Sequence, residues 1–523
     1  MRPVAWSSSY LFRWPLGIST VTSNCTDVVW PTPAGRGSPE VRICPGGVIA
    51  RTPRGPGKTP PRWRRRIWQA LVAVCLALVV VAGAVLVAIN VGSDADPDTV
   101  AAVPSDAEAV PDAVLPDLDE PAPVLAALTG PAPDPAAVAA VLAPLLAAPA
   151  LGTGLSAEVV DAATGQVLLD VDAAAPGTPA STAKLLTGLA ALTTLGPGAT
   201  VPTTVVAGAV PGQVVLVGGG DPTLSTTAPS LSYPGAPTVA ELAGQVQTAL
   251  AGVPVTSVVV DDSLFVGPLT ASGWGSEDAP STYAAPVTAT AVDGARRTPG
   301  QSPRSGQPGT DAGTALAAAL GAPGATVTLG TAPAGAAVLG QVRSAPVEQL
   351  VEQALTASDN LLADTLARQV ALATGAEASF TGAAQAVADA VSAAGFDTTG
   401  LSLSDGSGLS GEDLVPARLL VDVLEAGADG SVPGAATLLS GLPIAGYTGT
   451  LADRADADPA TEPGAVRAKT GTLSTTSALA GTVVTLDGRL LVFAVLADGT
   501  PGNVIAAEAA LDAVAGALAS CGC

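Results

Sequence analysis

A serine and a lysine lie three residues apart in the otherwise apolar stretch from Ala180 to Leu195, and this pair could perform nucleophilic chemistry. If the stretch is helical, Ser181 and Lys184 lie side by side, because residues i and i+3 share one face of a helix. Apolar surroundings disfavour the ammonium form of lysine and lower its pKa. A neutral amine beside a hydroxyl is a general base beside a nucleophile, so the spacing predicts a catalytic serine that a lysine activates.

Residue counts narrow the choice of base. The 523-residue chain contains no histidine, which excludes a Ser-His-Asp triad and any histidine metal site. We expect neither a metal nor a cofactor. Lysine occurs only three times, as Lys58, Lys184 and Lys469, and is the remaining base for a serine nucleophile. The structural alternative for Lys184 is a helix lysine whose amine extends to the surface.

A polar triplet, Ser358-Asp359-Asn360, interrupts residues 347–374, which show helical periodicity. Such a local break favours a functional site. The structural alternative is a helix cap, a position that Ser, Asp and Asn prefer. A further candidate segment, Lys469 to Thr472, precedes a predicted hairpin.

The pattern of apolar residues predicts several elements around these motifs. Two apolar runs joined by an Asp-Gly turn predict a hairpin of residues 478–486 and 489–496. A similar pattern predicts another hairpin over residues 155–170. We expect helices near residues 135–146 and 504–519.

Three short motifs occur in an order known from penicillin-binding proteins and class A β-lactamases: Ser181-x-x-Lys184, Ser358-x-Asn360 and Lys469-Thr470-Gly471. Longer stretches resemble the D-alanyl-D-alanine carboxypeptidase/endopeptidase family of class C, low-molecular-mass penicillin-binding proteins. They are PASTAKLLTGLAAL at the serine, LVGGGDPTL at 216–224, DGSGLS at 405–410, GYTGTLADR at 446–454 and RAKTGTL at 467–473. The resemblance covers about residues 125–520.

The resemblance implies an α+β fold. A serine DD-peptidase/β-lactamase-like domain, an antiparallel sheet flanked by helices, would consist of residues 123–200 and 341–520. Residues 201–340 contain short Val/Thr-rich runs separated by Gly and Pro, and we expect them to form an inserted β-rich domain. Within this insert, residues 298–313 are predicted to be a disordered loop.

The resemblance also implies roles for single residues in acyl transfer. Ser181 would attack the carbonyl between two D-alanines and form an acyl-enzyme, while Lys184 takes its proton. Ser358 would relay a proton to the departing D-alanine, and Asn360 would hold Lys184 and a substrate amide. Asp359 would be structural.

The third motif would bind the substrate. By the same resemblance, Lys469 would hold positive charge in the cleft, and with Thr470 it would bind the terminal carboxylate of the substrate or of a β-lactam. Gly471 and Thr472 would complete this binding segment. Backbone N–H groups of Ser181 and Thr472 would form the oxyanion hole.

The implied activity is that of a serine-type D-Ala-D-Ala carboxypeptidase, with DD-endopeptidase activity as an addition, acting on peptidoglycan stem peptides and acylated by β-lactam antibiotics. Two alternatives remain. A β-lactamase is disfavoured because no Glu-x-x-x-Asn motif lies between Ser358 and Lys469. A non-catalytic peptidoglycan-binding protein of the same fold is disfavoured because the motifs are complete.

The N-terminal region predicts a membrane anchor. A basic block, residues 51–66, precedes an apolar run from Ala70 to Ile89 that is long enough to span a bilayer. We expect a basic cytoplasmic tail without regular structure at 1–67, for which the alternative is a misassigned start. A transmembrane helix at 68–90, a linker at 91–122 and an extracellular catalytic body would follow. Secretion after signal cleavage is the alternative location. The net charge of −23 argues against nucleic acid as a partner.

Overall fold

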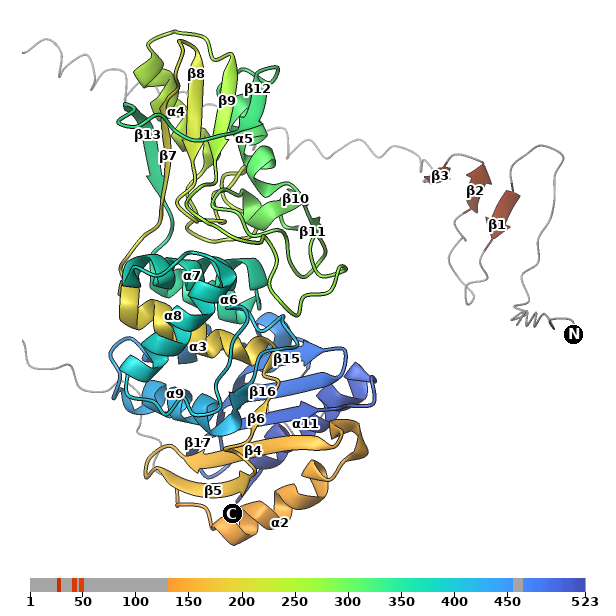
Figure 1. Cartoon of the computed structure of the whole chain (residues 1–523). Coiled ribbons are helices and arrows are strands. Elements are labelled where there is room, and N and C mark those ends of the chain that lie inside the picture. The colour runs from red at the N-terminus through yellow and green to blue at the C-terminus, as the bar shows by residue number, and fades with distance from the viewer. Residues whose placement is uncertain (1–25, 30–39, 45–46, 51–129, 455–463, 523) are drawn as a thin grey trace, which may run out of the picture. The chain divides into compact units, whose positions relative to one another are not determined.

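The computed structural model describes residues 26–29, 40–44, 47–50, 130–454 and 464–522 (Figure 1). The N-terminal unit contains three short antiparallel strands, β1 (Thr26–Val29), β2 (Glu40–Cys44) and β3 (Gly47–Ala50), where the sequence shows no strand periodicity. The predicted transmembrane segment and linker lie outside the described residues. Within the described residues, none of the helices combines the length and the apolar character that a bilayer span requires.

A five-stranded antiparallel sheet forms the centre of the main body, with strand order β15-β16-β17-β4-β5. Its strands are β4 (Gly154–Asp161), β5 (Gln166–Val171), β15 (Val466–Leu473), β16 (Thr476–Val484) and β17 (Leu490–Asp498). Both predicted hairpins are confirmed, as β4-β5 and β16-β17. The pairing of β4 with β17 joins the two ends of the main body in one sheet.

Helices cover both faces of this sheet (Figure 1). On one face, Val492 and Ala494 of β17 pack in a core with α3 (Lys184–Leu195), α6 (Val347–Thr356), α7 (Asn360–Thr374), α8 (Phe380–Ala393), α9 (Ala417–Asp429) and α10 (Ala436–Gly441). On the other face, Phe493 and Val495 pack with α2 (Pro135–Leu146) and α11 (Val504–Ala519), the two helices predicted at these positions. Because alternate side chains point to opposite faces, a strand that is covered on both sides is apolar throughout.

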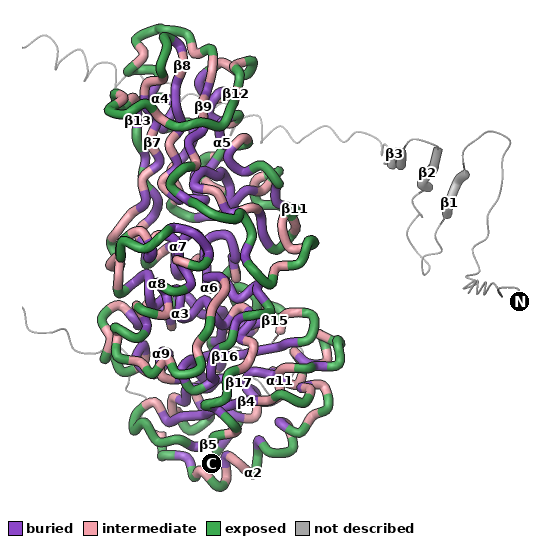
Figure 2. The backbone as a smooth tube through the Cα atoms, viewed as in Figure 1, coloured by how far each residue is buried: buried purple, intermediate pink, exposed green. Residues whose placement is uncertain are grey.

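The region predicted as one helical stretch, residues 347–374, consists of two helices. α6 ends at Thr356 and α7 begins at Asn360. The polar triplet that contains Ser358 lies between them. Figure 2 shows that α3 and α7, which carry two of the motifs, are buried along most of their length.

The insert folds around its own mixed sheet, with strand order β12-β9-β8-β7-β13. The strands are β7 (Pro202–Ala207), β8 (Gln213–Val217), β9 (Ser257–Asp261), β12 (Thr326–Leu329) and β13 (Val338–Arg343). Its first and last strands lie close to the predicted limits of the insert.

The prediction of a β-rich insert needs correction, because two helices share its core. Leu242 of α4 (Val239–Leu250) and Leu316 of α5 (Pro308–Ala319) are buried against the valines of the sheet. The parallel pairs β8-β9 and β9-β12 require such crossover segments. The predicted disordered loop is also wrong, because residues 298–313 include β11 (Gln301–Arg304), paired with β10 (Arg296–Thr298), and the start of α5.

Between its sheet and the main body, the insert contributes loops that pack on the helices. Phe265, Ala285 and Val287 of the insert form a buried cluster with Leu361 of α7 and Phe380 of α8. The insert is therefore attached to the helix that begins at the second motif.

The two faces of the sheet allow stability to be separated from catalysis. Phe493 is fully buried on the α2/α11 face, opposite the face that packs on α3. We expect Phe493→Ala to lower the free energy of unfolding by about 3–5 kcal/mol, because it leaves a cavity. Chemical denaturation measures this change. The exposed Leu486→Ala, in the turn between β16 and β17, is the control and should change stability by less than about 0.5 kcal/mol. Equal stabilities of the two variants would contradict the burial.

Candidate active site

Ser181 and Lys184 lie side by side at the start of a buried helix, as the spacing predicts. Residues Ala180–Ala183 form a 3-10 turn, η2, that leads directly into α3. Lys184 Nζ donates a hydrogen bond to Ser181 Oγ at 2.8 Å. Because Lys184 is only 1% exposed, the alternative of a surface lysine is wrong.

Three oxygen acceptors from separate parts of the chain hold the Lys184 amine. Besides Ser181 Oγ, the amine donates to Asn360 Oδ1 and to the carbonyl oxygen of Ser407, both at 2.6 Å. An ammonium group has three N–H donors, so each donor has a partner. All three acceptors are uncharged, and the amine is therefore positioned by hydrogen bonds. The predicted contact between Asn360 and Lys184 is confirmed.

The Ser407 carbonyl is placed by a loop, residues 405–410, that folds around the Asp405 carboxylate. This carboxylate accepts hydrogen bonds from the N–H groups of Ser407 and Gly408 at 2.7 and 2.6 Å. Trp274 of the insert donates its indole N–H to the same carboxylate at 2.6 Å. Gly408 has a φ of 74°, and a Cβ there would lie 1.8 Å from the Ala180 carbonyl oxygen. The loop therefore packs directly against Ala180, the residue before Ser181.

The environment of Lys184 makes its neutral form more accessible than that of an exposed lysine. Burial lowers the pKa of Lys184 to about 8. Four buried aspartates oppose this shift: Asp405, Asp364, Asp359 and Asp413. A base with a pKa close to the working pH combines basicity with a useful neutral fraction. Loss of a proton also gives Nζ a lone pair, which can accept the Ser181 hydroxyl proton.

Ser358 occupies an unusual backbone position at the end of α6. Its N–H donates to the Leu355 carbonyl, and the Asp359 N–H donates to the Ala354 carbonyl, which is the hydrogen-bond pattern of a Schellman cap. The residue at the Ser358 position of this cap is usually glycine, because it adopts positive φ, and Ser358 has a φ of 51°. A non-glycine residue there stores about 1–3 kcal/mol of strain. Such strain is typical of a functional residue.

Asp359 and Asn360 begin the next helix. Asp359 is the N-cap of α7, and its carboxylate accepts from the Leu362 N–H at 3.2 Å. The structural expectation for the triplet, a helix cap, is thus confirmed for Asp359. Ser358 and Asn360 point to the two lysines instead, so one junction provides both a cap and polar groups for the site.

Lys469 lies on β15 and contacts the second motif. Its Nζ donates to Ser358 Oγ and to the Thr470 carbonyl oxygen, both at 2.9 Å. The side chain is fully buried. Burial, and then the nearby charge of Lys184, hold the pKa of Lys469 well below its usual value. The three predicted motifs therefore form one hydrogen-bonded constellation.

Gly471 allows β15 to approach the serine. A Cβ at this position would lie 2.7 Å from the Pro179 carbonyl oxygen and 3.0 Å from the Ala180 Cβ. Any side chain at Gly471 would push β15 away from the turn that carries Ser181. The glycine is required for this close approach, which is a packing role beside the predicted one in substrate binding.

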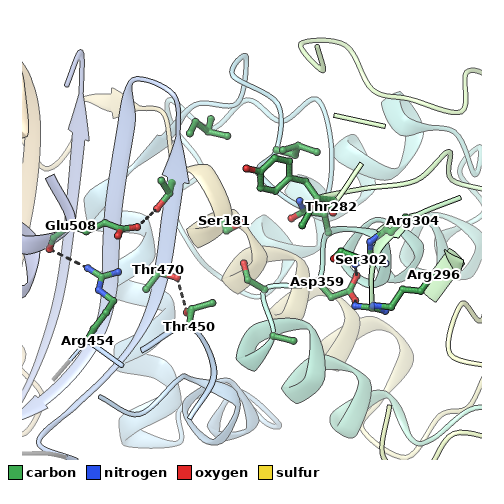
Figure 3. Close-up of a pocket in the computed structure, with 18 residues that line it drawn as sticks. Ser181, Thr282, Arg296, Ser302, Arg304, Asp359, Thr450, Arg454, Thr470 and Glu508 are labelled. Carbon is green, nitrogen blue, oxygen red and sulfur yellow. Dashed lines mark hydrogen bonds and ion pairs between the residues drawn. The ribbon is translucent and has the colours of Figure 1, made fainter. Parts of the chain in front are cut away.

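The motifs border a cavity of about 560 Å³, and Ser181 lies between its two ends (Figure 3). One end is lined by groups of the main body, including Thr450, Thr470, Thr472, Arg454 and Glu508. The other end is lined by groups of the insert: Thr282, Tyr283, Arg296, Ser302 and Arg304. The lining includes every predicted site residue except Lys184, Lys469 and Gly471, which lie behind it.

Hydrogen bonds order both ends of the cavity. At the main-body end, the hydroxyls of Thr450 and Thr470 are 2.8 Å apart, and Thr472 donates to Glu508 at 3.0 Å. At the insert end, Asn360 Nδ2 donates to the Tyr283 carbonyl oxygen at 3.4 Å. The sequence motifs predict no role for Thr450, Glu508 or Tyr283.

The site residues without a predicted role differ in whether the local sequence could have revealed them. Asp405 is followed by small residues that can turn around its carboxylate, a local pattern that sequence can reveal. Arg304 and Tyr283 reach the site only through the tertiary packing of the insert. Their sequence neighbourhoods carry no catalytic motif.

A cavity-lining serine that is hydrogen-bonded to a buried lysine, on an α+β fold, is the arrangement expected of a serine acyl-transfer enzyme. The chain belongs to the D-Ala-D-Ala carboxypeptidase 3 (S13) family, which it matches over residues 138–307 and 295–520. It is 41% identical over 473 residues to carboxypeptidase DacB of Mycolicibacterium smegmatis, covering 89% of this chain and 99% of that protein. A D-alanyl-D-alanine carboxypeptidase of Actinomadura sp. (strain R39) is 37% identical over 225 residues, covering 41% of this chain and 40% of that protein.

A solved structure supports the fold. The crystal structure of penicillin binding protein 4 (dacB) from Haemophilus influenzae matches with a TM-score of 0.57 at 22% identity, covering 72% of this chain and 98% of that chain. The expected α+β fold is confirmed by this likeness and by the central antiparallel sheet.

The packing at Gly471 gives a direct test of the geometry. Gly471→Ala should slow acylation by a fluorescent penicillin about 10²-fold, because a displacement of about 1 Å between β15 and Ser181 misaligns the reacting groups. Stopped-flow or gel labelling measures the rate. Gly244→Ala in α4, where nothing lies within 4 Å of the added methyl group, is the control and should react like wild type. A wild-type rate for Gly471→Ala would disprove the close approach.

Proposed function

We propose that this protein is a serine-type D-Ala-D-Ala carboxypeptidase, with DD-endopeptidase activity, that acts on peptidoglycan stem peptides through a Ser181 acyl-enzyme. The observation that carries the proposal is the buried amine of Lys184, hydrogen-bonded at 2.8 Å to the hydroxyl of Ser181 at the edge of the cavity. Family membership indicates the substrate class.

The first half of the reaction needs a proton acceptor and a site for developing charge. Neutral Lys184 takes the proton of Ser181 as its Oγ attacks the carbonyl carbon between the two D-alanines. The oxyanion forms beside the N-terminal turn of α3, where backbone N–H groups lack intrahelical acceptors. The N–H groups of Ser181 and Thr472 are the proposed donors to the oxyanion.

The leaving group then needs a proton. Ser358 Oγ, which accepts from Lys469 at 2.9 Å, is placed to pass a proton to the nitrogen of the departing D-alanine as the carbon–nitrogen bond breaks. The proton that Lys184 took from Ser181 restores the Ser358 hydroxyl, so Lys184 is neutral again. Water then attacks the acyl-enzyme and gives a proton to Lys184, which returns it to Ser181 Oγ as the ester bond breaks. The acyl group leaves Ser181 as a carboxylic acid.

The substrate's terminal carboxylate is proposed to bind near Lys469 and the paired hydroxyls of Thr450 and Thr470. Lys469 has a depressed pKa in the free site. A carboxylate entering the site would favour the ammonium form, because an opposite charge raises the pKa of a lysine. Substrate binding thus supplies the charge partner that makes a positively charged Lys469 stable.

The edge strand β15 offers a backbone template for the substrate. Its outer side is paired with residues 443–445 near Val466 and Ala468, while Thr470 and Thr472 line the cavity. An extended peptide can add to such an edge through main-chain hydrogen bonds. Strand addition would place its carbonyl beside Ser181.

The catalytic roles predict a graded series of variants. Ser181→Ala should abolish covalent labelling by a fluorescent penicillin, and Lys184→Arg should lower its rate by about 10²-fold or more, because guanidinium stays protonated. Lys469→Arg keeps a cation and should be milder. Labelling kinetics and mass detection of D-alanine released from muropeptides measure these effects. Circular dichroism of each variant is the control for folding.

The same experiment separates the alternatives. The wild-type penicilloyl-enzyme should persist for many minutes while the muropeptide turns over. Rapid release of hydrolysed penicillin would indicate a β-lactamase. A folded wild-type protein that neither labels nor releases D-alanine would indicate a non-catalytic binding protein.

We also propose that residues 70–89 anchor the protein in the cell membrane with its catalytic body outside. The support is the sequence alone: 20 apolar residues at about 1.5 Å each cover the hydrocarbon core, and the basic block lies on their N-terminal side. Secretion after signal cleavage is the alternative.

This topology predicts that protease added to intact, wall-stripped cells digests the chain beyond residue 91. Immunoblotting with an antibody against the C-terminus detects the loss. A cytoplasmic marker protein should survive the treatment. Full protection of the catalytic body would contradict the topology, and release into the medium would favour signal cleavage.

A further inference from the structure

Asp359 is the meeting point of three side chains from the insert. Its carboxylate accepts hydrogen bonds from Tyr233 Oη at 2.8 Å, Arg304 Nη2 at 2.9 Å and Arg296 Nη2 at 3.3 Å. Asp359 is 3% exposed and Arg304 is 4% exposed. A residue of the catalytic triplet is therefore clamped from outside the main body.

The clamp, which consists of Tyr233, Arg296 and Arg304, is held in place by further hydrogen bonds within the insert. Arg304 Nη1 donates to the Gly294 carbonyl oxygen at 2.6 Å, and Arg296 Nη1 donates to Tyr233 Oη at 2.9 Å. These additional hydrogen bonds fix the planes of both guanidinium groups relative to Asp359. Burial opposes ionisation of Asp359, but the charges of Arg304 and Arg296 hold its pKa well below the usual range. Asp359 is thus a fixed negative charge.

Stability alone is a weak reason for such a cluster. Removing charges from water is costly, and buried ion pairs are often replaceable by apolar residues without loss of stability. The cap of α7 does not require it either, because one oxygen of Asp359 suffices for the Leu362 N–H and asparagine caps helices as well as aspartate. The two arginines and the tyrosine are unnecessary for a cap.

The position of Asp359 indicates what the clamp does. Its neighbour Ser358 is held at a φ of 51° with its hydroxyl on Lys469, and its neighbour Asn360 holds Lys184. A strained backbone persists only where the surroundings over-determine it. Fixing the carboxylate between them limits the rotation of both flanking peptide units.

We propose that Asp359 is a positioning residue for acylation and that the insert, through Arg304, Arg296 and Tyr233, holds it in place. The proposal rests on the proposed catalytic roles of Ser358 and Asn360. It assigns the insert a part in the chemical step, beyond shaping one wall of the cavity. The clamp residues themselves touch neither lysine.

The test separates positioning from structural support by measuring two quantities. Fluorescent penicillin labelling gives an amplitude, the fraction of molecules that react, and a rate for those molecules. Asp359→Asn retains shape and capping ability, and Arg304→Gln removes one arm of the clamp. Both should keep the wild-type amplitude while the rate falls about 10- to 100-fold, as expected for misplaced catalytic groups. Arg304→Lys, which keeps the charge but loses the planar fork, should react at an intermediate rate.

Arg343→Gln is the matched control. Arg343 is an exposed arginine of the insert, and its guanidinium donates a hydrogen bond to Thr200. Its hydrogen bonds within the described residues do not involve the triplet. It should match wild type in amplitude and rate. If Asp359→Asn does not fold, the amplitude and rate of Arg304→Gln decide between positioning and structural support.

Two results would overturn the inference. A lower amplitude or melting temperature with a wild-type rate in the reacting fraction would show that the clamp is structural only. The same rate loss in Arg343→Gln would show a general effect of the insert. A wild-type protein without labelling would instead refute the proposed function, and with it the basis of this inference.

Discussion

The site depends on a buried amine that has three uncharged acceptors. Lys184 is 1% exposed, and its hydrogen bonds reach Ser181, Asn360 and Ser407. A charged amine could use all three as acceptors, whereas a neutral amine offers two donors and one lone pair. Loss of one proton therefore reverses the hydrogen bond with Ser181, so that the hydroxyl becomes the donor. The geometry that holds the ammonium is the geometry that creates the base.

Each acceptor requires a different element, and this explains the architecture around the site. Asn360 is fixed by the junction between α6 and α7, and Ser407 by the turn around Asp405. Gly408 and Gly471 allow the loop and β15 to touch the turn before Ser181. Segments from both ends of the main body must meet here. The central sheet, which pairs β4 with β17, joins those ends.

The sequence predicted the parts of this site that depend on local order. The i, i+3 pair of Ser181 and Lys184, the hairpins and the helices at 135–146 and 504–519 follow from spacing and periodicity. The polar triplet at Ser358 marks a break in the helical pattern, but periodicity predicts one helix where the structure has two, because a Schellman cap with serine in the glycine position has no sequence signature. Composition predicts that Arg304 lies in a disordered loop, whereas the structure places it at the end of β11. Its order comes from Asp359, 55 residues away.

The two lysines differ in the charges that surround them, and this difference suits them to different roles. Four buried aspartates favour the charge of Lys184, whereas the charge of Lys184 disfavours that of Lys469. The two buried cations repel each other, so the free site disfavours the doubly charged state. The substrate carboxylate that is proposed to bind beside Lys469 would stabilise a proton there. Lys184, whose pKa burial lowers to about 8, would then remain the group that can lose a proton near neutral pH and act as the base.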